Sequence, residues 1–132
     1  MVQSIFMIID DDKDDKFFFK QTTEGMFNAC CLQANDGADA LRQLRKKNQL
    51  PDFIFLDVNM PRMDGKECLK ELKKDKKLKY IPVIMYSTSF SEQSIEEFRM
   101  LGSANYLLKP TDMSKLPEQI IMAMKKSILP TL

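Results

Sequence analysis

The sequence lacks histidine and tryptophan altogether and contains only four glycines. Without histidine on the chain, catalysis by a Ser-His-Asp or Cys-His arrangement, zinc ligation by histidine and a phosphohistidine intermediate are excluded. The glycines, at positions 25, 37, 65 and 102, are too scattered to form a Walker or Rossmann phosphate loop. Nucleotide binding through such a loop is therefore not expected.

Cysteine, net charge and long apolar runs are limited too. The three cysteines, adjacent at 30 and 31 and single at 68, fit neither a disulfide framework nor a metal-binding spacing, so reduced and buried thiols are expected. A net charge of +1 gives no reason to expect direct binding to nucleic acid or to an anionic membrane. The N-terminal apolar stretch is too short for a signal peptide or a membrane span. These features predict a cytoplasmic protein.

The sequence does contain short, continuous apolar runs of the kind found in buried parallel strands. They cover residues 5–9, 53–56, 83–86 and 106–108, and polar residues follow each of them. These polar residues are Asp10 and Asp11, Asp57, Ser87 and Lys109. Because parallel strands end side by side, and open α/β sheets bind ligands at the carboxyl ends of their strands, we expect one polar site there.

Helical segments alternate with these strands. Apolar spacing and end signals predict a further strand at residues 29–33 and helices at residues 14–24, 38–46, 65–74, 92–101 and from about 116 onward, with Gly25 just past the first helix. Strict alternation predicts an α/β fold with a doubly wound, five-stranded parallel sheet in the flavodoxin-like order 2-1-3-4-5. The length of 132 residues fits a single domain, and we expect no output domain on the same chain.

Three carboxylates in one crevice require a counter-charge. Two unit charges about 4 Å apart repel by about 4 kcal/mol at an effective dielectric constant near 20, so Asp10, Asp11 and Asp57 favour a bound divalent cation. Oxygen ligands with room for water and a phosphate suit Mg²⁺. Lys109 and the Ser87 hydroxyl would then contact phosphoryl oxygens. Asp57 is left as a nucleophile that forms an aspartyl phosphate.

The segments IIDDD, IFLDVNMPRMDG, IPVIMYSTS and YLLKP resemble the four signatures of the receiver domain of two-component response regulators, in particular the single-domain, chemotaxis-regulator-like type. The resemblance implies that Asp57 accepts a phosphoryl group from a histidine kinase or a histidine phosphotransfer protein. It also implies that Mg²⁺ is held by Asp10, Asp11, Asp57 and the backbone carbonyl of Asn59. Among the three consecutive acids, the length of the first strand favours Asp10 and Asp11, with Asp12 opening the following loop.

The resemblance further implies a phosphorylation-driven switch rather than a conventional enzyme, with self-catalysed phosphorylation and slow dephosphorylation as its only reactions. Ser87 would be the switch hydroxyl, Tyr106 the aromatic side chain that moves inward, and the bond before Pro110 would be cis. A downstream protein would bind the altered face, and the chain would be a monomer or a phosphorylation-dependent dimer. The positions that tune phosphate lifetime in the family correspond to Asn59, Thr88 and Ser89.

Two other functions stay open from the residues alone. A phosphohydrolase of the haloacid-dehalogenase type also uses a strand-end aspartate and Mg²⁺, but its motif needs a second acid at the position where Asn59 stands. A non-phosphorylated pseudo-receiver acting as a binding module would account for the fold, although it would leave the convergent acids and lysine without a role.

Two surface features are expected. Phe17, Phe18 and Phe19 are consecutive on a helix and cannot all face a core, so at least one reaches solvent, either as a partly covered edge residue or as a docking point for the helices of a kinase. A lysine-rich run is interpreted as a solvated helix end. It consists of Lys73, Lys74, Lys76, Lys77 and Lys79.

Overall fold

A computed structural model describes residues 3–128 of the chain. Five strands form one parallel sheet in the order β2-β1-β3-β4-β5. The strands are β1 (Ile5–Ile9), β2 (Cys30–Ala34), β3 (Phe53–Asp57), β4 (Val83–Ser87) and β5 (Asn105–Leu108). The helices are α1 (Lys13–Phe27), α2 (Gly37–Lys46), α3 (Gly65–Lys74), α4 (Glu92–Met100) and α5 (Leu116–Ile128), with a short 3₁₀ helix at Met113–Lys115.

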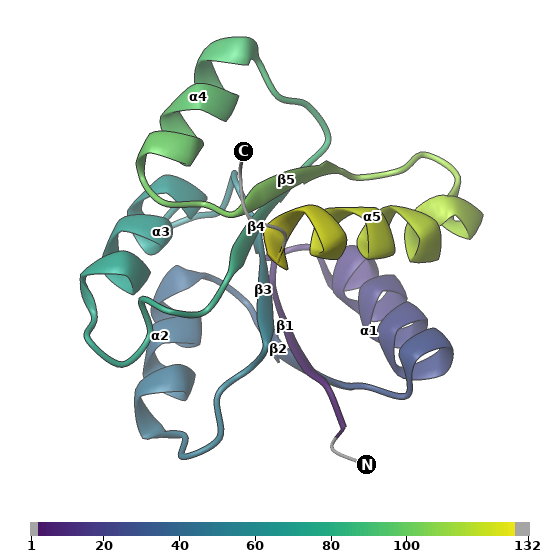
Figure 1. The fold of residues 1–132 in the computed structure, drawn as a ribbon, viewed down its shortest axis with the longest axis horizontal. Helices are drawn as coiled ribbons and strands as arrows, with labels where there is room; N and C mark the ends of the chain where they lie inside the picture. The colour runs from purple at the N-terminus through teal and green to yellow at the C-terminus, as the bar shows by residue number, and fades with distance from the viewer. Residues whose placement is uncertain (1–2, 129–132) are drawn as a thin grey trace.

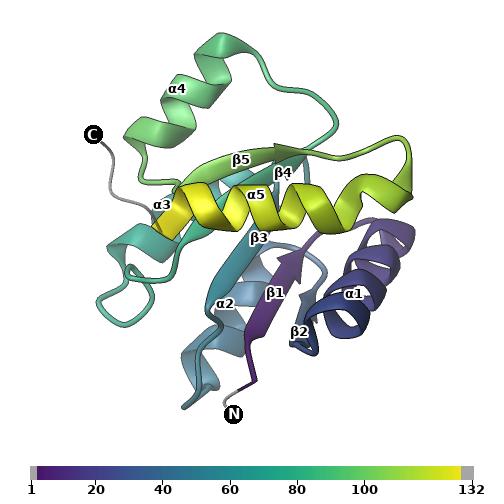
Figure 2. The same cartoon turned by 45° about the vertical axis from the view of Figure 1, so that its right-hand side comes forward.

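The elements form three layers, with the sheet in the middle (Figures 1 and 2). Helices α1 and α5 cover one face of the sheet, and α2, α3 and α4 lie on the other. This arrangement confirms the predicted doubly wound fold and its strand order. Among residues 3–128, no helix is both long and apolar enough to cross a membrane.

The boundaries of α1 and β2 differ from the sequence prediction. Helix α1 continues through Gly25 and ends at Phe27, because the left-handed residue that caps it is Asn28, with φ of 49°. Asparagine tolerates this conformation better than most residues, so it can end a helix as glycine does. Strand β2 is shifted by one residue from the prediction, since its pairing with β1 starts at Cys30 opposite Ile5.

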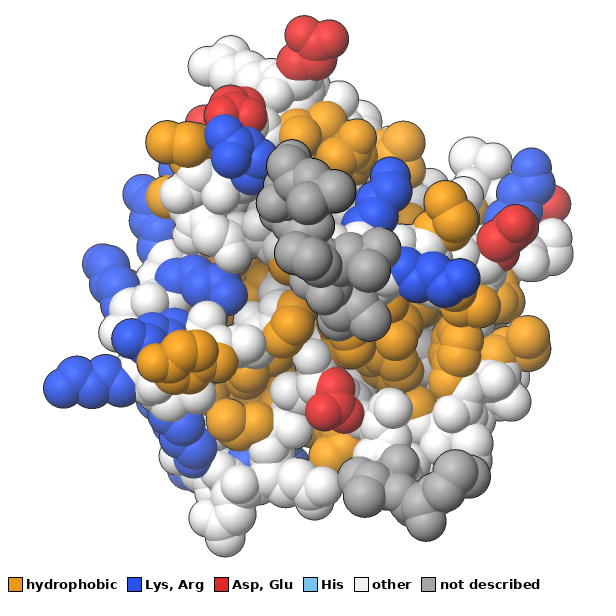
Figure 3. Space-filling view, viewed as in Figure 1, with side chains coloured by type: hydrophobic (Ala, Val, Ile, Leu, Met, Phe, Trp, Pro, Cys, Tyr) orange, Lys and Arg blue, Asp and Glu red, His pale blue; other side chains and the backbone are white. Residues whose placement is uncertain are grey.

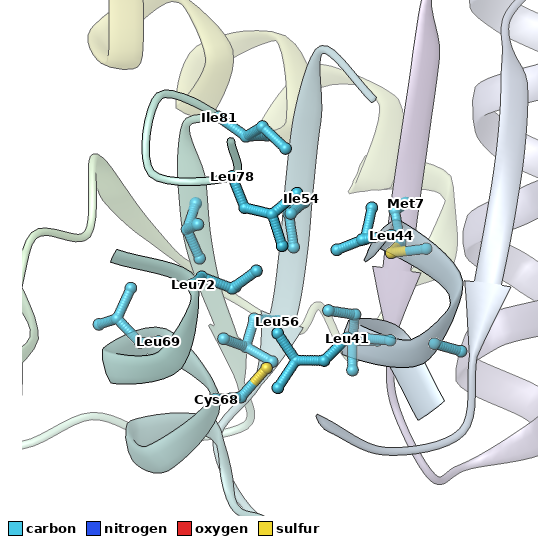
Figure 4. Packing of buried hydrophobic residues seen from close by; sticks show 14 of the residues in the cluster. Met7, Leu41, Leu44, Ile54, Leu56, Cys68, Leu69, Leu72, Leu78 and Ile81 are labelled. Carbon is cyan, nitrogen blue, oxygen red and sulfur yellow. The ribbon is translucent and has the colours of Figure 1, made fainter. Parts of the chain in front are cut away.

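Two clusters of buried side chains hold the layers together. Figure 4 shows the aliphatic cluster, in which side chains of β1 and β3 such as Met7 and Leu56 meet Leu41 of α2 and Leu72 of α3. The cluster on the other face is rich in aromatic residues. Its largest buried side chains are those of Phe6, Phe19, Phe55 and Tyr86.

The three consecutive phenylalanines of α1 have different environments. Phe19 is fully buried, with its ring centroid 4.8 Å from that of Phe55. Phe17 and Phe18 are 54% and 41% exposed, and their rings pack edge to face. The prediction that at least one of the three reaches solvent is therefore confirmed.

All three cysteines are free thiols, and the structure buries Cys31 and Cys68 while Cys30 is half-buried. Burial raises the pKa of the Cys31 thiol to about 11 and that of Cys68 to about 12. Both thiols are therefore protonated and poorly reactive at neutral pH.

The lysine-rich run begins in the last turn of α3 and continues into the loop before β4. Figure 3 shows Lys and Arg side chains gathered on the left of the molecule, where α2 and α3 lie in Figure 1. Two of these lysines have structural contacts: Lys73 Nζ donates to the carbonyls of Lys79 and Ile81, and Lys77 Nζ donates to the carbonyl of Lys47. The contacts of Lys73 thus close the loop between α3 and β4. The contact of Lys77 holds this loop against the residue that caps α2.

Gly65 allows α3 to start directly against the end of β3. Its N–H donates to the carbonyl of Val58 over 2.9 Å. A Cβ atom at position 65 would lie 2.4 Å from the carbonyl oxygen of Asp57 and 2.8 Å from the Cα of Val58. Both neighbours are backbone atoms, so they cannot move aside without shifting the strand end that carries Asp57.

We expect Gly65→Ala to lower the free energy of unfolding by about 1–3 kcal/mol, because the added methyl group overpacks a rigid backbone contact. Gly25→Ala is the matched control, since a Cβ there meets nothing within 4 Å. In the interior of α1 this control should raise stability by about 0.5–1 kcal/mol. Urea unfolding followed by circular dichroism measures both values, and equal effects of the two substitutions would contradict the argument.

Candidate functional site

The sheet delivers four polar side chains to one edge. Asp57 is the last residue of β3 and Ser87 the last of β4, while Asp10 and Lys109 directly follow β1 and β5. Backbone bonds continue the sheet past these ends: Asp10 N–H donates to the carbonyl of Ala34, and Lys109 N–H donates to that of Ser87. The predicted convergence of strand-end residues is therefore observed.

Three of the carboxylates form a cluster. Asp10, Asp11 and Asp57 each offer an oxygen, and these oxygens lie within 4.8 Å of one another. Asp10 and Asp57 are buried and Asp11 is exposed, so the cluster opens to solvent on one side. Asp12 is not part of it: its carboxylate caps α1 by accepting from the N–H groups of Asp14 and Asp15. The pair at the cluster is thus Asp10 and Asp11, as strand length predicts.

Lys109 provides the positive charge beside this cluster. Its Nζ lies 2.8 Å from Asp10 Oδ2, 2.9 Å from Asp15 Oδ2 and 3.5 Å from Asp57 Oδ1. It also lies 5.2 Å from the centre of the Tyr86 ring. The Lys109 side chain is only 11% exposed, so these contacts replace most of its hydration.

Sequence reasoning missed Asp15. The sign available in the sequence was a second acid pair, Asp14 and Asp15, four residues after the first, in the opening turn of α1. With Asp12 as the N-cap, Asp15 stands at the third helical position, in the first turn, which begins next to the end of β1. A short link between β1 and α1 therefore brings it to the same edge of the sheet as Lys109.

Burial controls the protonation of the site in the absence of a metal ion. Burial, and then the neighbouring charge of Asp10, raise the pKa of Asp57 to about 7, while Lys109 opposes the shift. For Lys109, burial alone would lower the pKa of the amine, but the hydrogen bonds to Asp10 and Asp15 outweigh it. The pKa of Lys109 is therefore raised and the side chain stays charged.

The remaining predicted site residues are Ser87, Asn59, Thr88, Ser89 and Tyr106. Ser87 is buried, and its hydroxyl accepts weakly from the N–H of Ser89 over 3.4 Å. Asn59, Thr88 and Ser89 are exposed. Tyr106 is 42% exposed on β5, where its ring meets that of Phe90 at 5.1 Å, so it does not contact the site.

The expectation of a cis bond before Pro110 is wrong for this structure. None of the peptide bonds among residues 3–128 is cis, so the bond between Lys109 and Pro110 is trans. The trans form is favoured by about 0.5–1 kcal/mol for bonds that precede proline. Lys109 makes its contacts with Asp10 and Asp57 from this trans backbone.

A parallel sheet of order 2-1-3-4-5 with acids, a hydroxyl and a lysine at its carboxyl edge defines a flavodoxin-like domain whose polar site lies where this fold binds ligands. The family model of the response regulator receiver domain matches residues 6–121. The chain therefore belongs to the response regulator receiver family, and it is a phosphorylation-dependent signalling switch. Neither a phosphohydrolase nor a non-phosphorylated binding module finds support in these comparisons.

Three relatives illustrate the similarity. The chain is 31% identical to the chemotaxis protein CheY-3 of Vibrio cholerae over 114 residues, which cover 86% of each chain. The phosphorylated cyanobacterial phytochrome response regulator RcpA has a similar structure, with a TM-score of 0.83 and 28% identity, covering 98% of this chain and 100% of that one. The Mn²⁺-bound form of response regulator Rcp1 has a TM-score of 0.79 and 25% identity, covering 98% and 99%.

The raised pKa of Asp57 predicts a pH-dependent effect of Asp57→Asn in metal-free buffer. Between pH 3.8 and about 7 the unfolded chain ionises Asp57 while the folded protein keeps it protonated. Rising pH therefore removes stability from the wild type over this range and not from the Asn variant. We expect the variant to be more stable by on the order of 4 kcal/mol at pH 8, and the gap to shrink towards pH 4.

Urea unfolding in the presence of a chelator, at several pH values, measures this gap. Asp14→Asn is a suitable control because Asp14 is exposed and carries the same charge in the adjacent helical turn. A gap between Asp57→Asn and wild type that stays constant with pH would show that Asp57 has an ordinary pKa.

Proposed function

We propose that this chain accepts a phosphoryl group on Asp57 and catalyses its own phosphorylation and slow dephosphorylation. The observation that carries the proposal is the buried Asp57 carboxylate at the end of β3, with Lys109 Nζ 3.5 Å away and two further acids beside it. In the transfer step an Asp57 oxygen forms a bond to phosphorus. The bond from phosphorus to the donor's histidine nitrogen, or to the bridging oxygen of an acyl phosphate, breaks and leaves its electron pair on the donor.

The acid cluster fits a hard divalent cation. Asp10, Asp11 and Asp57 supply oxygen donors, which Mg²⁺ prefers, and we place the backbone carbonyl of Asn59 as the fourth protein ligand. The Mn²⁺-bound form of the relative Rcp1 supports a cation here. When bound, Mg²⁺ supplies positive charge that balances the carboxylates and the transferring phosphoryl oxygens.

The other residues of the site bind and orient the phosphoryl group. Lys109 Nζ donates to one phosphoryl oxygen and balances its charge, and the Ser87 hydroxyl donates to another. Asn59, Thr88 and Ser89 are exposed around Asp57, and their size and polarity set how easily water reaches the acyl phosphate. They therefore tune its lifetime.

In this proposal the phosphoryl donor is a phosphorylated histidine. Because this chain contains no histidine, the donor belongs to another protein. A histidine kinase or a histidine phosphotransfer protein has the required chemistry. Phe17 and Phe18 form an exposed aromatic pair on α1, with ring centroids 5.6 Å apart, and α1 also carries Asp15 of the site. We place the docking of the donor's helices on this pair, since large exposed apolar side chains favour a partner surface.

Phosphorylation from a small acyl phosphate tests the acceptor. We expect acetyl phosphate with Mg²⁺ to add one phosphoryl group to the wild type, detected by intact-mass spectrometry. Labelling should be lost in Asp57→Asn and should fall by at least about tenfold when a chelator removes the metal. Asp14→Asn is the control for the loss of one surface charge. A folded wild type that takes up no phosphate would overturn the proposal.

We also propose that phosphorylation draws Ser87 and Tyr106 inward and changes the face formed by α4, β5 and α5, which binds a downstream protein. Tyr106 is half exposed beside Phe90, so its ring has room to move. We further predict that the output acts through a separate chain. The protein itself would be a monomer or a dimer that forms on phosphorylation.

Fluorine NMR can follow this movement because the chain has only three tyrosines, Tyr80, Tyr86 and Tyr106. In protein labelled with 3-fluorotyrosine, the Tyr106 signal should shift on phosphorylation, and it should not shift in Asp57→Asn. Tyr80 is highly exposed and serves as the internal control. A Tyr106 signal that stays in place while Asp57 is mostly phosphorylated would exclude its role in the switch.

A further inference from the structure

Asp15 is the one acidic partner of Lys109 that neither the predicted site nor the carboxylate cluster includes. Its Oδ2 lies 2.9 Å from Lys109 Nζ, a contact as short as that of Asp10. The Asp15 side chain is 32% exposed, so it has partly given up water to make this contact. The two hydrogen bonds occupy two of the three N–H donors of the ammonium. The third is left for a group on the Asp57 side.

Two anchors matter because a lysine side chain is flexible. Fixing its rotatable bonds costs conformational entropy, and a single hydrogen bond does not fix its direction. Contacts with Asp10, directly after β1, and with Asp15 on α1 hold Lys109 Nζ near Asp57 Oδ1, at 3.5 Å. The position of the ammonium beside the acceptor is therefore set before any donor arrives.

The two anchors are not equivalent. Asp10 also belongs to the cluster of three carboxylates, so its charge is shared between Lys109 and any cation that the cluster holds. Asp15 lies outside that cluster, and its carboxylate serves Lys109 alone among the contacts described for residues 3–128. When a cation engages Asp10, Asp15 is the carboxylate that still holds the ammonium.

We propose that Asp15 is a positioning residue, which keeps Lys109 Nζ directed at the phosphoryl-accepting edge of Asp57 once Asp10 is engaged by a cation. This inference rests on the proposed function, and it adds a residue of α1 to the groups that control phosphoryl transfer. Asp15 touches neither the acceptor nor the transferring group, so its effect passes through Lys109.

Asp14 provides a matched control. It neighbours Asp15 in the first turn of α1, it carries the same charge, and both side chains interact favourably with the helix dipole. Asp14 is exposed, and its side chain does not contact Lys109, whose acidic partners are Asp10, Asp15 and Asp57. Asp14→Asn therefore reproduces the loss of charge and of dipole stabilisation without the loss of the anchor.

The decisive experiment is a double-mutant cycle. Rates of labelling by acetyl phosphate are compared for wild type, Asp15→Asn, Lys109→Met and the double variant, each at saturating Mg²⁺. We expect Asp15→Asn to slow labelling by about tenfold in the wild-type background and to have no further effect beside Lys109→Met. Lys109→Gln replaces Lys109→Met if the latter does not fold.

A spectroscopic readout separates the anchor from a general loss of stability. In protein with ¹⁵N-labelled lysine, a held Lys109 ammonium gives a distinct side-chain signal, identified by its absence in Lys109→Met. With Mg²⁺ present, this signal should broaden or vanish in Asp15→Asn and persist in Asp14→Asn.

The outcomes separate the two proposals. A wild type that takes up no phosphate overturns the proposed function, and the NMR comparison still tests the anchor. If the wild type is labelled, then an unchanged or faster rate in Asp15→Asn, or an equal slowing in the Lys109→Met background, overturns the role of Asp15.

Discussion

The site depends on one ammonium group held among carboxylates. Lys109 Nζ contacts Asp10, Asp15 and Asp57, and Asp11 adds a fourth acid to the same edge. A pair of unit charges about 4 Å apart is worth about 4 kcal/mol at an effective dielectric constant of 20, so a single positive charge does not balance four negative ones. The raised pKa of Asp57 expresses the same imbalance, since burial and Asp10 favour its protonated form. This edge of the sheet therefore favours the binding of a further positive charge, such as a divalent cation. The bound cation could in turn interact with a negatively charged group such as a phosphoryl group.

Such an unfavourable group of charges requires a rigid support. The two buried clusters provide it, because they fix β1 and β3 from both faces of the sheet. The close contact of Gly65 with the carbonyl of Asp57 then sets where α3 begins, and with it the loop beside the acceptor. Stability from the core thus offsets the cost of gathering acids at the strand ends, and the site owes its geometry to residues that take no part in its chemistry.

Much of this could be predicted from the sequence, because apolar runs that end in polar residues specify both the strands and the groups at their ends. Three features that were not predicted are the end of α1, the contact of Asp15 with Lys109 and the trans bond before Pro110. Each depends on backbone geometry that the sequence pattern does not specify. Helix α1 ends at Phe27 rather than before Gly25, because the left-handed conformation of the capping residue Asn28 decides where it stops. Asp15 reaches Lys109 only because the cap at Asp12 and the short link from β1 orient the first turn of α1. The trans bond before Pro110 was equally out of reach, since the energy difference between isomers is small.

The path from the acid cluster to the exposed side chains of β5 is short. The carbonyl of Ser87 accepts from the N–H of Lys109 over 2.7 Å, so the ends of β4 and β5 are joined at the site itself. Three residues after Ser87, the ring of Phe90 meets both Tyr106 on β5, at 5.1 Å, and Phe98 on α4, at 6.4 Å. If phosphorylation draws the end of β4 inward, as proposed above, the two residues between Ser87 and Phe90 would transmit the shift to this aromatic contact. Because Tyr106 and Leu108 are exposed while Phe98 is buried, the contact joins the core to the surface. On the proposed function, a change in the packing of Phe90 against Tyr106 would let a partner bound at the exposed side of β5 respond to phosphorylation of Asp57.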